Sequence, residues 1–521
     1  MSDSMQPAFK KCIVAVIGTT GVGKSKLAVQ IAKAIGGQIV NADSMQVYKG
    51  LDIATNKPTS NELALVPHHL FSFVDPLHEY SMSQFSRDAQ AAIDTIHAQK
   101  HIPVIVGGTN YYIQSLLWED VTIPSAPTAG LGGQGPLEEN IHPSIDQTSE
   151  LVKKLVDALV SSDPRVNTPV QLAEFIQLPT MYLLLEQIDP DMAHRWHPKN
   201  YRKIRRSLEI YLVTGKLHSV WIKEQKDEKK RHVTRLKYPT VFIWLNSQRS
   251  ILNNRLNDRV DEMISNGLFS ELQEMRNKVL AGQVIGAELF INNEALFSDA
   301  SQVESDESDG ESLNSTDTHM KITKNVRGIM QAIGFKEFEE YFKTLESKDS
   351  SKHAALDRMK LLGIEAMKTA TRQYARQQTT WIRNKLAPAC LAEHVDGHAA
   401  FYLIDATVLD DWETRIQSQA IQLVESFVKD GKTVDPQSIS DAAKELLPNL
   451  ADIKKEKDRH VDDHSQVFAQ NDTKRWGKRR CDVCIDITTK LPKVVHGEHE
   501  WQIHINSRKH RKRVTQSKSN S

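Results

Sequence analysis

Residues 11–35 constrain the fold of this chain more than any other stretch. The apolar run KCIVAVIG (11–18) is typical of a buried strand, and KSKLAVQIAKAI (24–35) has the spacing of a helix that ends at Gly36-Gly37. Between them, GTTGVGKS matches the pattern G-x-x-x-x-G-K-[ST]. A strand, a glycine-rich turn and a helix in this order indicate a phosphate-binding loop in an α/β fold.

The overall charge hides two oppositely charged segments. The 66 Lys and Arg residues balance 66 Asp and Glu residues. However, residues 299–317 carry seven acidic side chains and no Lys or Arg, whereas residues 474–521 carry 13 basic and four acidic ones. Because local fields steer polyanions, net neutrality does not exclude a nucleic-acid partner.

Several protein classes are excluded by composition. No apolar run reaches about 18 residues, so we expect no membrane span, and the start MSDSMQPAFKKC has no hydrophobic stretch typical of a secretory signal. Four cysteines in 521 residues make no disulfide framework. The close pair Cys481 and Cys484 instead suggests a metal site in a reducing compartment.

The order of predicted elements indicates the fold class and the domains. Strands are predicted near 38–44, 103–108 and 241–245, with a helix over about 83–100, and this alternation predicts a parallel α/β sheet. We expect a P-loop-type core over 1–120 and 216–390, with a disordered acidic loop at 297–320. The expected remainder is a helical insertion at 121–215, an ambiguous region at 391–473 with a weak strand at 400–404, and a basic module at 474–521.

The glycine-rich turn has a chemistry of its own. Glycines let backbone N–H groups converge on phosphate oxygens, Lys24 places a charge on the terminal phosphates, and the Ser25 hydroxyl is a Mg²⁺ ligand. The predicted phosphate-binding residues are Gly18, Thr19, Thr20, Gly21, Val22, Gly23, Lys24 and Ser25. The pattern does not specify which phosphate compound is bound.

Asp43 follows the second predicted strand, in NADSMQVY (41–48). Ligands of open α/β sheets bind beside the carboxyl ends of the strands. An aspartate at this place is a general base, a Mg²⁺ ligand or a turn-forming residue. On position alone, the turn and the base are about equally supported.

Eight ordered segments resemble one enzyme family. They are GTTGVGKSKLA, NADSMQVYKGLDIATNKPT, PHHLFSFVDP, GGTNYYIQSLLW, DPDMAHRWHPKNYRKIRRSLEIYLVTGK, RVDEMISNGL, QAIGFKEF and TRQYARQQTTW. Together they resemble the tRNA dimethylallyltransferases (tRNA isopentenyltransferases) of eukaryotic type, over roughly residues 11–387 and the C-terminal module.

The resemblance implies a reaction and a donor. In this family the dimethylallyl group moves from dimethylallyl diphosphate to N6 of adenosine 37 in the tRNA anticodon loop. The glycine-rich loop would then hold the diphosphate with Mg²⁺ rather than ATP. Because the lone pair of N6 is delocalised into the ring, a base must take the N6 proton during attack.

The same resemblance assigns roles to individual residues. Asp43 matches the general base of the family, and Thr109 and Arg259 match residues that contact the diphosphate. Ser44 and Gln46 are expected to orient the adenine. Without the resemblance, Arg259 would be read as a surface ion pair with Asp261 or Glu262.

Two basic stripes are candidates for tRNA binding. Arg202, Arg205 and Arg206 share one face of a predicted helix at 199–209, and Lys368, Arg372 and Arg376 share another, with Trp381 beyond. The alternative is a solvated helix face, and the family context favours RNA. We expect the insertion and the core to clamp the anticodon stem-loop around an extruded adenosine.

The C-terminal module has the pattern of a zinc finger. Cys481-Asp-Val-Cys484 is C-x₂-C, and WQIHINSRKH (501–510) resembles the W-x₂-H-x₂-S-x₂-H of matrin-type C₂H₂ fingers. We therefore assign Zn²⁺ to Cys481, Cys484, His504 and His510. The 19 residues between Cys484 and His504 exceed the usual dozen, so His496 or His499 is an alternative to His504.

Three other functions share parts of the pattern. A P-loop kinase needs neither basic stripes nor a finger, a prenyltransferase acting on free AMP or ATP needs no helical insertion, and an RNA-binding adaptor needs no intact Gly23, Lys24, Ser25 and Asp43. We expect a monomer in the cytoplasm, with mitochondria and nucleus as further locations.

Overall fold

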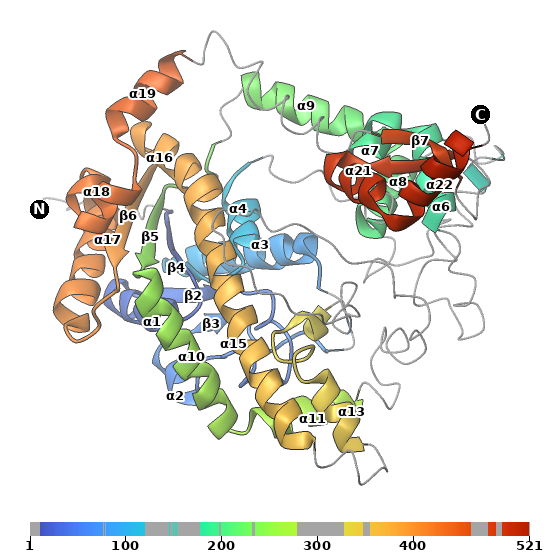
Figure 1. Cartoon of the computed structure of the whole chain (residues 1–521). Coiled ribbons are helices and arrows are strands. Elements are labelled where there is room, and N and C mark those ends of the chain that lie inside the picture. The colour runs from blue at the N-terminus through green and yellow to red at the C-terminus, as the bar shows by residue number, and fades with distance from the viewer. Residues whose placement is uncertain are drawn as a thin grey trace, which may run out of the picture. The chain divides into compact units, whose positions relative to one another are not determined.

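Six parallel strands form the centre of the larger of two compact units in the computed structural model (Figure 1). They are β1 (Ile13–Gly18), β2 (Gly37–Asn41), β3 (His68–His69), β4 (Ile102–Val106), β5 (Thr240–Asn246) and β6 (Ala399–Asp405), in the order β3-β2-β4-β1-β5-β6. The β-branched runs predicted as strands are buried on both faces, as all-parallel sheets require. The predicted α/β fold class is confirmed.

The structure describes residues 11–76, 78, 80–119, 145, 150, 152–153, 178–196, 200–231, 235–278, 328–346, 355–459, 478–485 and 492–519. The predicted acidic loop at 297–320 lies outside these residues. Among the described residues, no helix is long and apolar enough to cross a membrane. One unit comprises 1–121 and 234–457, and the other comprises 122–233 and 458–521.

Helices cover both faces of the sheet because successive strand residues point to opposite sides. Val14 and Val16 of β1 pack in one core with α1 (Lys24–Ile35), η6 (Trp412–Gln417) and α17 (Ser418–Asp430). Ile13 and Ile17 pack in the other core with α3 (Met82–Ala98), α4 (Asn110–Leu117), η5 (Ile382–Leu386), α16 (Ala387–Val395) and α18 (Asp441–Leu446).

A third apolar core lies outside the sheet. It joins residues 47–51 to α10 (Arg249–Ser265), α11 (Leu268–Lys278), η4 (Gly328–Gln331), α13 (Glu339–Glu346) and the long α15 (Leu356–Trp381). In the segment that follows Asp43, the backbone N–H groups of Ile53 and Ala54 donate to the Glu271 carboxylate of α11 at 2.9 Å each. The segment that follows Asp43 is therefore held against the helices by both apolar packing and hydrogen bonds.

Residues 391–459 contribute directly to the sheet. The weak strand predicted at 400–404 is β6, which pairs in parallel with β5 along its whole length. The helices η6 and α17 then return over the sheet and pack on it. The remaining elements of this unit are α2 (Ser60–Leu65), η7 (Pro436–Ser438) and α19 (Leu450–Arg459).

The second unit is helical at its centre. Its described elements are α6 (Leu178–Ile188), α7 (Pro190–Arg195), α8 (Tyr201–Thr214) and α9 (His218–Arg231). The first three share a core that includes Leu185, Ile204 and Leu208. The C-terminal residues of this unit form an antiparallel pair, β7 (Lys478–Ile485) and β8 (Pro492–His496), followed by α21 (Gly497–Asn506) and α22 (Arg508–Ser519).

Candidate active site and candidate metal centre

The glycine-rich segment forms the turn between β1 and α1. Thr19 is buried, and Gly23, just before the first helical residue, has φ 92°. A Cβ at Gly23 would also lie 2.6 Å from the ring of Trp412. Only glycine meets both conditions, so this position is set by the backbone conformation as well as by the close packing of the indole.

Lys24 interacts electrostatically with two other charged groups, Asp43 and Arg259. Its Nζ donates to the carbonyl oxygen of Thr19 at 2.5 Å. Burial lowers the pKa of Lys24 from 10.5 to about 8, Asp43 opposes this change, and Arg259 adds to it. The lysine charge is thus poorly solvated, and an anion placed beside Lys24 and Arg259 would stabilise it. Ser25, the next residue, is exposed at the first turn of α1.

Asp43 and Thr109 extend from the carboxyl ends of the neighbouring strands β2 and β4. The Asn41 side chain accepts from the Asp43 N–H at 3.0 Å and donates to the Leu70 carbonyl at 2.9 Å, which fixes the start of the loop. The Thr109 hydroxyl accepts from the Ser44 N–H at 3.0 Å and donates to the Ser44 hydroxyl at 3.1 Å. The two loops are therefore joined side by side.

The two oxygens of the Asp43 carboxylate lie in different surroundings. Its Oδ1 accepts from the N–H of Met45 at 3.0 Å, which is a turn-forming contact. Its Oδ2 lies on the side of Gly108, where an added Cβ would be 3.0 Å away. One oxygen shapes the loop, and the second faces the group of side chains described next.

Tyr374 and Gln378, which the sequence analysis did not assign, complete this group. The Gln378 amide donates to the Gly108 carbonyl and accepts from the Thr20 N–H, both at 2.9 Å. Burial raises the pKa of Tyr374, Asp43 raises it further, and hydrogen bonds with Gln378 and Thr109 lower it. Their i, i+4 spacing in TRQYARQQTTW was the available signal.

Arg259 extends from α10 toward the same loops. Its Nε donates to the Asn56 side chain at 2.7 Å. Burial lowers the pKa of Arg259, and the charges of Glu262 and Asp43 raise it. The structure thus brings Arg259 within electrostatic range of Asp43 and Lys24, and Glu262, the expected surface partner, acts on it as well.

The predicted tRNA-binding residues of the unit that contains the sheet differ in how they are held. Gln46 donates to the carbonyls of Thr55 and Asn56 at 3.1 and 2.9 Å. Arg372 donates to Asn257 at 2.5 Å and to Thr369 at 2.9 Å. Arg376, one turn further along α15, is exposed.

The predicted stripe in the helical unit lies on α8. Arg205 forms an ion pair with Glu209 at 2.7 Å, and Arg206 lies 3.8 Å from the second oxygen of the same carboxylate. Arg202 is also in α8, but its side chain lies outside the described residues. Glu209 therefore offsets part of the positive charge that the sequence pattern suggested.

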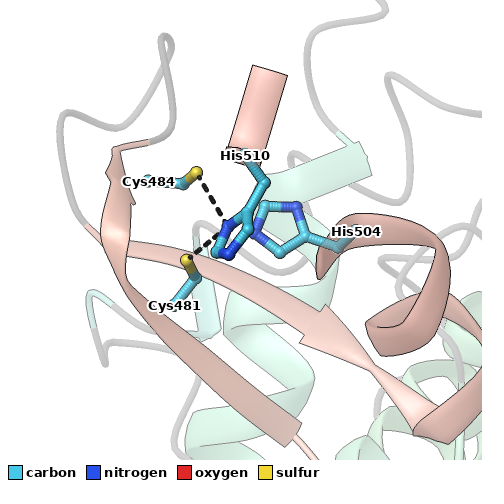
Figure 2. A group of neighbouring side chains, drawn as sticks. All are labelled: Cys481, Cys484, His504 and His510. Carbon is cyan, nitrogen blue, oxygen red and sulfur yellow. Dashed lines mark hydrogen bonds between the residues drawn. The ribbon is translucent and has the colours of Figure 1, made fainter. Parts of the chain in front are cut away.

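Four side chains meet in the C-terminal module (Figure 2). Cys481 and Cys484 lie on β7, His504 on α21 and His510 on α22, and one potential ligand atom from each lies within 4.8 Å of all the others. Both sulfur atoms are 3.5 Å from Nδ1 of His510. A tetrahedral zinc ion separates sulfur and nitrogen ligands by about 3.5 Å, so the geometry fits zinc. The side chains of His496 and His499, the alternative ligands, lie outside the described residues.

Comparison with known proteins identifies relatives over nearly the whole chain. A family model described as IPP transferase matches residues 46–385, and one described as Isopentenyl transferase matches residues 11–71. A tRNA dimethylallyltransferase of Schizosaccharomyces pombe is 34% identical over 512 residues, covering 98% of this chain and 96% of the relative. That of Saccharomyces cerevisiae is 32% identical, covering 96% and 92%.

A solved structure supports the same grouping. It is described as crystallographic snapshots of a eukaryotic dimethylallyltransferase acting on tRNA. It is 29% identical in sequence, has a TM-score of 0.61, and the match covers 98% of both chains. The likeness therefore extends over the sheet, the helical unit and the C-terminal module.

Gln378→Leu tests whether the amide joins the two loops. The change leaves the Thr20 N–H and the Gly108 carbonyl without their partner, and we expect a loss of about 1–3 kcal/mol in the free energy of unfolding, measured by urea denaturation. The control is Gln377→Leu at the exposed neighbouring position. Equal stability of the two variants would contradict the role of Gln378.

His510→Gln tests the metal centre. We expect the purified wild-type chain to carry one zinc ion and the variant to carry much less, as measured by elemental mass spectrometry, because three remaining ligands bind zinc weakly. His398→Gln, which changes an exposed histidine remote from the cluster in sequence, is the control. Unchanged zinc content in His510→Gln would refute the assignment.

Proposed function

This chain belongs to the family of the tRNA dimethylallyltransferases, and on that premise we propose that it transfers the dimethylallyl group from dimethylallyl diphosphate to N6 of adenosine 37 in the tRNA anticodon loop. The observation that carries this proposal is the arrangement of Asp43 opposite two cations. Lys24 follows β1 and Arg259 extends from α10, and both lie within electrostatic range of the Asp43 carboxylate at the carboxyl end of β2.

The cations and the glycine-rich loop bind the diphosphate in this proposal. Lys24 and Arg259 neutralise the charge that grows on the leaving group as the bond between carbon and oxygen breaks. The exposed Ser25 hydroxyl is an oxygen ligand of the type that Mg²⁺ prefers, at a helix start suited to phosphate. Bound Mg²⁺ would supply further charge neutralisation. Thr109, whose hydroxyl is hydrogen-bonded to Ser44, helps to hold the diphosphate near Asp43 in this proposal.

Asp43 acts as the general base. The lone pair of N6 forms the new bond to the first carbon of the dimethylallyl group, the carbon–oxygen bond breaks, and diphosphate leaves with the electron pair. The N6 proton passes to the Asp43 carboxylate, whose Oδ2 is on the side of Gly108 and the Tyr374 hydroxyl. Because Met45 holds Oδ1 in the loop, the carboxylate keeps one orientation during the transfer.

The adenine must leave its stacked position in the anticodon loop to reach Asp43. Extruding a stacked base costs a few kcal/mol, which contacts to the RNA must offset. We propose that Ser44 orients the base, that Gln46 contributes by fixing the loop to Thr55 and Asn56, and that Arg376 contacts the RNA backbone. Arg202, Arg205 and Arg206 in the helical insertion and the basic finger at 474–521, with structural zinc, bind the tRNA outside the loop.

Asp43→Asn tests the general base. The amide keeps an oxygen for the Met45 N–H but accepts no proton, so we expect dimethylallyl transfer to fall by at least about 10²-fold while binding of tRNA and donor changes little. Mass spectrometry of nucleosides measures the product, and filter binding measures the affinities.

Asp94→Asn, an exposed change on α3, is the control and should retain full activity. Near-normal turnover by Asp43→Asn would remove Asp43 from the role of base. Consumption of ATP but not of dimethylallyl diphosphate by the wild-type chain would refute the transferase itself.

The low pKa of Lys24 predicts a pH dependence of donor binding. Lys24 is protonated below its pKa of about 8 in the free enzyme and neutral above it. The dissociation constant of dimethylallyl diphosphate should therefore rise about tenfold per pH unit above pH 8, as one proton is taken up on binding. Titration calorimetry from pH 7 to 9 measures this slope. Lys24→Met should bind more weakly throughout, and an equally steep slope in that variant would contradict the assignment.

A further inference from the structure

Two exposed aromatic side chains meet beside the proposed active site. Tyr111 is 44% exposed and Trp381 is 37% exposed, although both residue types normally bury most of their surface. Their ring centroids are 6.2 Å apart and the rings are nearly perpendicular, with an interplanar angle of 79°. The pair contributes an aromatic surface that solvent reaches.

The pair is continuous with the groups around Asp43. Tyr111 stands two residues after Thr109, in the first turn of α4. Trp381 follows Tyr374 and Gln378 at i+7 and i+3, so the three side chains share one face of α15. The rise of a helix places Trp381 about 10 Å along the axis from Tyr374. The aromatic pair therefore lies on α4, which Thr109 precedes, and on α15, which carries Tyr374 and Gln378.

Positive charge surrounds this aromatic surface. Arg376, Arg383 and Lys385 are exposed near the C-terminal end of α15 and in η5. In contrast, Lys368, nearer the start of α15, is held by Asp261 at 2.8 Å. Three exposed cations therefore lie near the end of the helix that carries the indole. An aromatic surface with cations around it suits a single-stranded polyanion whose bases are unstacked.

We propose that Tyr111 and Trp381 form a stacking platform for the nucleotide next to the target adenosine. This inference rests on the proposed function. Extraction of the adenine deprives its neighbours of a stacking partner, and a base placed on the indole regains one. The platform thus offsets part of the cost of extrusion.

Trp381→Ala tests the platform with the full-length chain and an anticodon stem-loop RNA. We expect the dissociation constant of the RNA to rise about tenfold, since stacking on an aromatic ring contributes about 1–3 kcal/mol per base. Trp381→Phe should restore most of the affinity. The affinity for dimethylallyl diphosphate and the transfer rate at saturating RNA should stay within about twofold. Leu361→Ala, which changes another exposed apolar residue of α15, is the control and should leave RNA affinity unchanged.

Stem-loops that lack the base on the 5′ or the 3′ side of the target adenosine identify the stacked nucleotide. If the platform holds that base, removing the base and removing the indole together should weaken binding no more than either change alone. The platform would be overturned by additive losses for the 5′ and the 3′ stem-loops, or by unchanged RNA affinity of Trp381→Ala. In either case, transfer by the wild-type chain would still uphold the proposed function. Absence of transfer and of RNA binding by the wild-type chain would overturn both.

Discussion

The side-chain amide of Gln378 makes the contact on which the candidate active site depends. It donates to the Gly108 carbonyl and accepts from the Thr20 N–H, so a residue of α15 joins the turn after β1 to the turn after β4. Both turns are built from glycine and would otherwise have wide conformational freedom. A long helix, anchored in its own apolar core, thus holds the glycine-rich turn against the turn of Gly108 and Thr109, and Thr109 is in turn hydrogen-bonded to Ser44 in the loop of Asp43.

Electrostatics explain why a site of this kind suits the proposed anionic donor. Lys24 and Arg259 are poorly solvated, and burial lowers the pKa of each. A single carboxylate, Asp43, acts on both cations. In the proposed function, a diphosphate brings enough negative charge to neutralise both cations and leaves Asp43 free to accept a proton. The same desolvation that weakens the cations in the free chain therefore strengthens their interaction with the donor.

The sequence predicted those parts of the molecule that are local. The strand, turn and helix of residues 11–35 follow from adjacent residues, and Cys481 and Cys484 lie on one strand. Tyr374 and Gln378 were not predicted, because a polar residue on a helix does not reveal which neighbour it faces. For the same reason, the contact of Arg372, a predicted RNA-binding residue, with Asn257 was not foreseen. Contacts between residues more than 100 positions apart depend on the packing of α10 and α15, which no local pattern encodes.

Trp412 shows that the candidate site also depends on residues far along the chain from the glycine-rich turn. It lies in a region whose sequence pattern was ambiguous, yet its indole packs against Gly23, and its Nε1–H donates to Gln30 of α1 at 2.8 Å. The Lys26 ammonium lies 4.7 Å from the ring centroid, on the first turn of the same helix. Since a larger residue at Gly23 would collide with the ring, the indole leaves room only for glycine at this position. The strand β6 and the helix η6 therefore belong to the candidate site as much as the glycine-rich pattern does, because they bring the indole that packs against Gly23.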